Sequence, residues 1–411
     1  MFASTIVVNA FNYVYHFVMS RRLGVVDYGA LASIFAGLVI ASVPAAILTM
    51  VAVKYAAEFN AAGDRARLRA LGLRVLQVTA VFGVAALLAT IAFAGPLARY
   101  LNIAEPRAIA AGGAALAVGL ITPVLRGVVQ GAQDFRRLAI STALEAASKL
   151  LFGLGFVFAG FGLVGAILGY AVGSLVSLIY TIIVVRGYAS VPAPRLSIDL
   201  RRLSATTRGI AFATFAFTSL SFADVVLVKH FFSPHLAGLY GAISLVGKVL
   251  LFVVGFVPTI VLPKATTRAA NGEPPLPILL QAGSAIVVLL GLGLGALYVA
   301  PALALRVMAG SAFVGAASYV FPYGVAMTLL AATGMVMSYK VGLHRFDFVV
   351  PLGFAAIGEI VAIQFVHARI DQVINVLIIG HAFALVGTLY AVHRPVALGR
   401  EYTVTSAREV A

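Results

Sequence analysis

The chain alternates long apolar runs with short polar segments, and most of the runs are close to about twenty residues long. A helix needs about 20 apolar residues to cross roughly 30 Å of hydrocarbon. Only helices and closed barrels satisfy every backbone group in lipid, and barrel strands alternate apolar and polar residues. These runs do not alternate, so we predict an all-α integral membrane protein with about twelve transmembrane helices. The predicted spans are residues 2–20, 31–53, 72–94, 108–128, 138–159, 162–185, 209–229, 237–260, 277–299, 316–338, 347–367 and 372–392.

The composition supports this prediction, because 62% of the residues are hydrophobic and 10% are charged, whereas a soluble domain carries roughly 25% charged residues. The chain has no cysteine, which excludes disulfides, thiol catalysis and zinc–thiolate sites. It also lacks a phosphate-binding loop, a Gly-x-Ser-x-Gly turn and a His-Glu-x-x-His motif. We therefore expect no enzyme activity, no cofactor and no metal site. The net charge of +15 lies in loops, where it sets topology, so nucleic acid is not an expected partner.

The distribution of lysine and arginine predicts the orientation. The loops after even-numbered spans, together with the C-terminal tail, hold 20 of these residues, and the loops after odd-numbered spans hold seven. Since basic residues concentrate on the cytoplasmic side, we predict that both termini are cytoplasmic. The first run has no basic segment before it and no cleavage site after it, so it is predicted to be a retained span rather than a signal peptide.

A repeated pattern divides the chain into halves. Residues 27–32 (DYGALA) and 238–243 (GLYGAI) each open the second span of a predicted six-span set. We therefore predict two pseudo-symmetric six-helix bundles related by an axis along the membrane normal. The predicted organisation is an N-terminal bundle (1–185), a cytoplasmic linker (186–208), a C-terminal bundle (209–393) and a cytoplasmic tail (394–411).

Four charged residues are candidates for lining a substrate cavity: Lys149, Lys248, Arg126 and Glu145. A charge at membrane depth costs about 2.5–3.5 kcal/mol, so such residues usually face a partner or a cavity. Glu145 precedes Lys149 by four residues on one helix face, which also allows the two to neutralise each other. Lys248 has no acidic neighbour on its own helix, so its alternatives are a cross-helix ion pair and a cavity position.

Three further residues are candidates for ion coupling. Glu359 is a solitary carboxylate near the middle of the eleventh span, and His381 lies near the middle of the twelfth. Asp224 lies in the outer third of the seventh span, where a solvated rim is the alternative interpretation. For His381, the alternative is a hydrogen-bonded core residue.

Two stretches resemble the polysaccharide-export family of lipid-linked oligosaccharide flippases, which includes the O-antigen flippases. The first stretch is Arg21, Arg22, Gly24, Asp27, Tyr28 and Gly29, and the second comprises Asp224, Tyr240, Pro263 and Lys264. The family belongs to a superfamily that also contains multidrug and toxin extrusion transporters and the lipid II flippase.

The resemblance implies a V-shaped pair of six-helix bundles in the cell (inner) membrane that opens alternately to either side. It implies transport of a polyprenyl-pyrophosphate-linked oligosaccharide for cell-surface polysaccharide biosynthesis, with membrane lipid and other polysaccharide-assembly proteins as further partners. A cationic cleft containing Lys149 and Lys248 would suit a pyrophosphate. The alternatives are an ion-coupled multidrug or organic-ion antiporter on the same scaffold and, more remotely, a membrane glycan polymerase or ligase.

Overall fold

The structure is a computed structural model that describes residues 2–189, 205–255, 257–343, 345–390 and 392. Every regular element that these residues form is helical, which confirms the predicted fold class. Most of the predicted linker (190–204) and the whole tail (394–411) lie outside the described residues. The helices are α1 (Phe2–Ala41), α2 (Val43–Ala61), α3 (Arg65–Ala92), α4 (Ala94–Tyr100), α5 (Pro106–Gly131), α6 (Phe135–Phe156), η1 (Val157–Phe161), α7 (Gly162–Arg186), α8 (Ala205–Phe231), α9 (Pro234–Val253), α10 (Val257–Ala270), α11 (Leu276–Val299), α12 (Pro301–Met308), η3 (Ser311–Ala316), α13 (Ala317–Gly342), α14 (Val349–Phe365) and α15 (Ile370–Leu389).

Nine helical stretches in the described part of the chain are long and apolar enough to cross a membrane. One of them, Phe135–Arg186, contains the fifth and sixth predicted spans, and another, Val7–Ala41, contains most of the first predicted span and the beginning of the second, which continues in α2. Gly24 separates the first and second predicted spans, with a φ of 72° that only glycine adopts without strain. Gly160 and Gly162 separate the fifth and sixth in the same way. The predicted eleventh span corresponds to α14, which has 17 residues.

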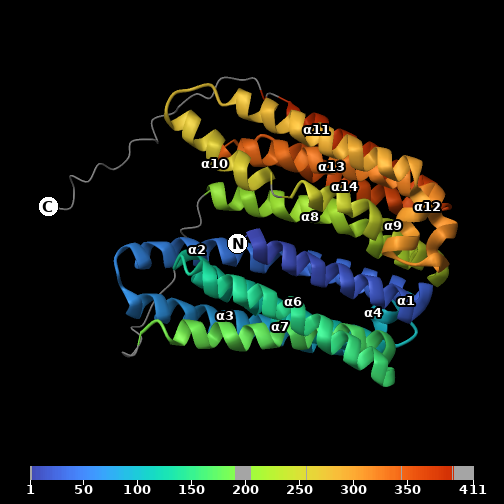
Figure 1. The fold of residues 1–411 in the computed structure, drawn as a ribbon, viewed down its shortest axis with the longest axis horizontal. Helices are drawn as coiled ribbons and strands as arrows, with labels where there is room; N and C mark the ends of the chain where they lie inside the picture. The colour runs from blue at the N-terminus through green and yellow to red at the C-terminus, as the bar shows by residue number, and fades with distance from the viewer. Residues whose placement is uncertain (1, 190–204, 256, 344, 391, 393–411) are drawn as a thin grey trace.

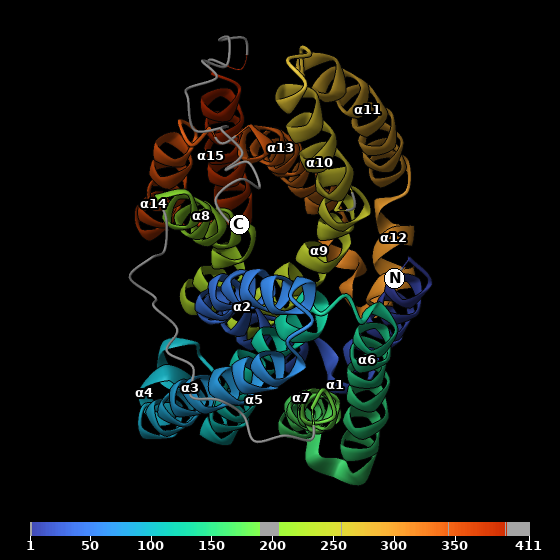
Figure 2. The ribbon, with the colours of Figure 1, turned by 90° about the vertical axis from the view of Figure 1, so that its left-hand side faces the viewer.

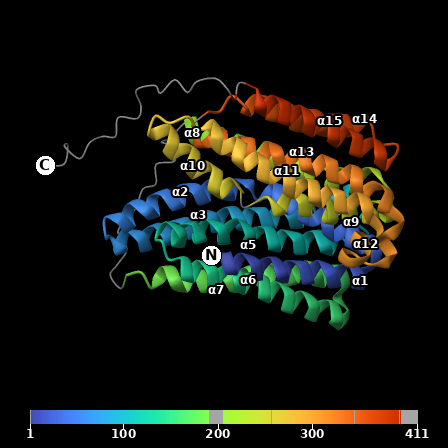
Figure 3. The same ribbon diagram turned by 45° about the horizontal axis from the view of Figure 1, so that its top comes forward.

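The helices form two lobes (Figure 1). Helices α1 to α7 make up one lobe and α8 to α15 the other, with α1 next to α8 and α9. An end-on view shows the same division (Figure 2), and a tilted view shows the long helices running roughly side by side (Figure 3). The lobes join where α1 packs on α8 and α9, so the residues of these three helices decide how the lobes meet.

Local sequence explains where several of these helices begin. Asp64 and Asp134 precede α3 and α6, and each carboxylate accepts a hydrogen bond from a backbone N–H in the first turn. Ser233 caps α9 in the same way. Large apolar side chains such as Val287 and Phe365 remain 71% and 82% exposed, which fits surfaces that face lipid.

Candidate functional site

In the N-terminal lobe, Arg126 of α5 is held by the polar side chains of α6 and α7. Its guanidinium lies 2.6 Å from a carboxylate oxygen of Glu145 and donates to the Ser141 hydroxyl at 2.8 Å. It also donates to the Ser177 hydroxyl at 2.5 Å. Glu145 accepts a further hydrogen bond from Ser174 at 2.7 Å. Arg126 therefore neutralises Glu145, the carboxylate for which a pair with Lys149 was one of two alternatives.

Lys149, one helical turn beyond Glu145, has a different environment. Its ammonium donates to the side-chain oxygen of Asn12 on α1. It also lies 4.9 Å and 5.6 Å from the ring centres of Tyr15 and Tyr170, within the range of a cation–π interaction. The side chain is buried. The backbones of α6 and α7 also approach closely here, since a Cβ atom added to Gly173 would come within 2.6 Å of the Lys149 backbone nitrogen. These partners are neutral, so they stabilise the ammonium without cancelling its charge.

In the C-terminal lobe, Asp224 of α8 is the centre of a buried polar cluster. The Tyr240 and Tyr323 hydroxyls donate to one carboxylate oxygen at 2.9 Å and 2.8 Å. The Lys248 ammonium lies 3.7 Å from the other oxygen. Asp224 is 0% exposed, so the solvated-rim interpretation is wrong. Lys248 therefore forms a cross-helix ion pair, which was one of the two environments that the sequence left open for it.

Glu359 of α14 and His381 of α15 form a second buried pair in this lobe. A Glu359 carboxylate oxygen lies 3.2 Å from Nε2 of His381, and the other ring nitrogen lies 2.9 Å from the carbonyl oxygen of Ala326. Neither Glu359 oxygen has well-oriented hydrogen-bond geometry in the described part of the chain. An ionisable carboxylate buried with so few partners is the kind of group that exchanges a proton or binds a cation during transport.

The repeated motif lies where the lobes meet. A Cβ atom added to Gly29 would come within 2.6 Å of the Gly238 Cα atom, and one added to Gly238 within 2.0 Å of the Val25 carbonyl oxygen. Gly241, the repeat counterpart of Gly29, faces Ala32 across the same contact. The two copies of the motif therefore pack against each other, and their small residues let two backbones touch.

Hydrogen bonds reinforce this contact at one end of the molecule. Arg21 donates to the carbonyl oxygens of Arg306 and Val307 at 2.8 Å and 3.1 Å. The Asn102 amide donates to the His230 carbonyl at 2.7 Å, and the rings of Tyr100 and His230 stack with centres 3.9 Å apart. These residues lie in or beside the loops that follow odd-numbered spans, which the sequence predicts to be outside the cytoplasm.

The structure disperses the other residues predicted as a motif. Tyr28 is buried and bonds to His16 in the N-terminal lobe, whereas Arg22 stacks on the Phe158 ring at 4.5 Å. Asp27 is exposed on α1. Pro263 and Lys264 are exposed on α10, away from these contacts.

The sequence indicated the charged residues but not all of their partners. It indicated Arg126, Glu145, Asp224, Lys248, Glu359 and His381 as separate candidates, and the structure joins them into three groups. Lys149 and Lys248 contact residues of their own lobes. The neutral partners were missed: Tyr15, Tyr170, Ser141, Ser177 and Tyr323. Buried Tyr hydroxyls usually need a polar partner, which is the signal that could have pointed to them.

Solved structures of membrane transporters share this architecture. An inward-facing structure of a multidrug resistance MATE family transporter of the MOP superfamily matches with a TM-score of 0.77 over 94% of both chains, at 14% identity. Lipid II flippase MurJ, in an inward closed conformation, matches with a TM-score of 0.71 over 95% of this chain and 87% of its own, at 10% identity. The eukaryotic MATE transporter AtDTX14 matches with a TM-score of 0.69 over 96% and 94%, at 14% identity. The chain has the fold of these transporters.

No family model and no curated protein matches the sequence. The structural matches therefore establish a multi-pass, two-lobe membrane fold. Both a flippase and multidrug transporters occur among them, so the substrate has to be argued from the residues of this chain.

Proposed function

We propose that this protein is a transporter of the inner membrane that translocates a polyprenyl-pyrophosphate-linked oligosaccharide by alternating access. In this mechanism the two lobes separate at one face of the membrane and close at the other. The Gly29–Gly238 contact and the Arg21 hydrogen bonds would hold the outer ends together in the inward-facing state. They would break when the substrate is released outside.

The observation that carries the choice of substrate is the environment of Lys149. Arg126 is neutralised by Glu145 and Lys248 by Asp224, whereas the Lys149 ammonium is held by an amide oxygen and two aromatic rings. A retained positive charge at membrane depth attracts an anionic group strongly, because the surrounding dielectric constant is low. A pyrophosphate attached to a lipid is such a group, and the flippase-like motifs support the same substrate class.

A second candidate is an ion-coupled drug or organic-ion antiporter. The buried carboxylates Asp224 and Glu359 favour it, because a cation-coupled exporter needs acidic groups inside the membrane. The same residues would equally couple a flippase to an ion gradient, so they support ion coupling more than they select a substrate.

The two candidates are separated by the requirement for charge at position 149. In cells that lack their own oligosaccharide flippase, we expect the wild-type protein to restore surface polysaccharide. Lys149→Gln should reduce the restored polysaccharide by at least about tenfold, because a charge-assisted contact to the substrate is worth about 1.5–3 kcal/mol. Lys149→Arg should retain most of it, and Arg107→Gln, at an exposed position at the start of α5, serves as a control of equal charge change.

Full polysaccharide synthesis with Lys149→Gln would remove the argument for an anionic substrate. Export of organic cations that is lost in Asp224→Asn but unaffected by Lys149→Gln would favour the antiporter instead. Membrane insertion of every variant is checked by its amount in the purified membrane fraction.

A further inference from the structure

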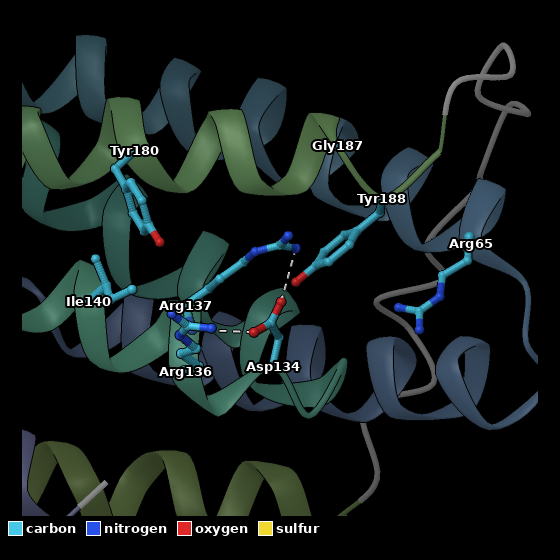
Figure 4. A pocket seen from close by; sticks show the side chains of 8 residues that line it. All are labelled: Arg65, Asp134, Arg136, Arg137, Ile140, Tyr180, Gly187 and Tyr188. Carbon is cyan, nitrogen blue, oxygen red and sulfur yellow. Dashed lines mark hydrogen bonds and ion pairs between the residues drawn. The ribbon is translucent and has the colours of Figure 1, made fainter.

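A cavity of about 580 Å³ opens at the end of the N-terminal lobe, where α3 and α6 begin and α7 ends. Its lining includes Arg65, Asp134, Arg136, Arg137, Tyr180 and Tyr188. Figure 4 shows Asp134, Arg137 and Tyr188 close together beside the end of α7, with Arg65 farther away on α3. The site is separate from the Lys149 environment and from the contact between the lobes. Its volume lies within the range of about 300–1,000 Å³ that is usual for small-molecule sites.

The charges that line this cavity are unbalanced. Three guanidinium groups face one carboxylate, and that carboxylate already has two roles. Asp134 caps α6 by accepting from the backbone N–H of Arg137 at 3.2 Å, and it pairs with the Arg137 side chain at 3.1 Å. Among the described residues, neither Arg65 nor Arg136 has a carboxylate within ion-pair distance. The cavity therefore presents an excess of two positive charges.

Neutral donors complete the lining. The Tyr188 hydroxyl is buried and has no hydrogen-bond partner in the described part of the chain. Burial raises the pKa of Tyr188 to about 12, and the nearby Asp134 charge adds to the effect. The phenol therefore keeps its proton at physiological pH and can donate it. A buried donor without a partner destabilises the fold, and a bound acceptor would remove that cost.

The position of the cavity suggests where its ligand comes from. Phe135 and Ile140, on the first turns of α6, are 47% and 43% exposed, as expected of side chains that meet lipid. Arg65 and Arg136 lie in the first turns of α3 and α6. Each of these helices follows a loop after an even-numbered span, and the charge distribution predicts that these loops are cytoplasmic. The cavity thus lies at the level of phospholipid headgroups.

We propose that this cavity is a binding site for a phosphate-bearing anion, held by Arg65, Arg136 and the Tyr188 hydroxyl. Guanidinium groups bind phosphate through paired N–H donors, and the phenol hydroxyl supplies one more hydrogen-bond donor from another side of the anion. The anion reaches the site either as the headgroup of an acidic phospholipid or as a soluble phosphate compound. Both sources present the same oxygen atoms, and binding here is independent of the transported substrate.

The test uses a fluorescent dye attached to a single introduced cysteine. The chain has no cysteine, so Ile140→Cys provides a single attachment point for an environment-sensitive dye at the cavity. The labelled protein is titrated in neutral detergent with short-chain phosphatidylglycerol, with short-chain phosphatidylcholine and with inorganic phosphate. We expect a saturable response to phosphatidylglycerol, to inorganic phosphate or to both, and at least about tenfold weaker binding of phosphatidylcholine. A response to the lipid alone identifies a headgroup site, and a response to inorganic phosphate identifies a site for soluble anions.

Variants of the cavity then test the assigned residues. Arg65→Gln combined with Arg136→Gln should weaken anion binding at least about tenfold, since each charge-assisted hydrogen bond contributes appreciably. Tyr188→Phe, which removes one oxygen atom and keeps the ring in place, should weaken binding about threefold to tenfold. Arg99→Gln combined with Arg107→Gln removes two exposed charges from the same lobe and should leave binding unchanged.

Two results would overturn the proposal. One is the absence of a saturable response to either anion in a labelled protein that elutes as a single folded species. The other is an equal loss of binding in the cavity variant and in the Arg99 and Arg107 control, which would show a general charge effect without a site.

Discussion

The glycine contact between the lobes can be tested by adding a single methyl group. In Gly238→Ala, the new Cβ atom would lie 2.0 Å from the Val25 carbonyl oxygen and 2.7 Å from its carbonyl carbon. Both are backbone atoms of α1, so no side chain can rotate away and relieve the overlap. The overlap can be relieved by a shift of α9 relative to α1, which separates the lobes at this end.

The size of the effect follows from known overpacking costs. An added methyl group in a tightly packed contact costs about 1–3 kcal/mol. At about 1.4 kcal/mol for each factor of ten, Gly238→Ala should shift the equilibrium between the closed and open outer ends by about fivefold to 150-fold. Gly37→Ala on α1 is the matched control, because a Cβ atom there would meet nothing within 4 Å.

Distances between spin labels measure this shift directly. Arg99→Cys and His235→Cys place labels at exposed positions on the two lobes near the contact, in a chain without other cysteines. Gly238→Ala should move the distance distribution toward longer values, while Gly37→Ala should leave it in place. An unchanged distribution for Gly238→Ala, with helical content intact, would refute the interpretation that the contact controls the outer ends.

Three further outcomes are expected, two from buried ion pairs and one from the bend in α1 at Gly24. Glu145→Gln should lower the free energy of unfolding by about 2–3 kcal/mol because it leaves Arg126 without its ion-pair partner, and thermal unfolding in detergent measures this loss. Asp224→Asn should also destabilise the protein, and a combined Lys248→Met change should restore the melting temperature but not ion-coupled transport, since it replaces the ion pair with neutral groups. Gly24→Ala should cost about 1–3 kcal/mol through its backbone conformation alone (φ 72°, ψ −179°), because its Cβ atom would meet nothing within 4 Å; the same unfolding experiment on Gly37→Ala supplies the reference.

The sequence was sufficient to predict the elements of the fold, because a bilayer imposes a length and an apolar character on each span. It also indicated the duplication through residues 27–32 and 238–243. It did not show that these two stretches pack against each other. That contact depends on the absence of side chains at Gly29 and Gly238, and a glycine gives no sequence signal for what it touches.

The candidate site was predicted less completely than the fold. The spacing allowed Glu145 to pair with Lys149 on the same helix. In the structure, Glu145 pairs instead with Arg126 from a neighbouring helix, at 2.6 Å. Similarly, no pattern within α8 shows that Asp224 faces two tyrosines from α9 and α13. Partners that lie on different helices are set by how the helices rotate and pack, and a single sequence does not specify that rotation.

Translocation in reconstituted vesicles tests the central claim most directly. The protein is placed in vesicles with a fluorescent polyprenyl-pyrophosphate-linked oligosaccharide, and the amount that reaches the opposite leaflet is measured over time. The same cysteine pair at positions 99 and 235, without spin labels, also accepts a thiol-reactive cross-linker with a reducible disulfide spacer, which holds the two lobes together at this end. We predict rapid translocation by the free protein, its loss on cross-linking and its recovery on reduction. Equal translocation by the cross-linked and free protein, or none by the free protein while it moves an organic cation, would contradict the account.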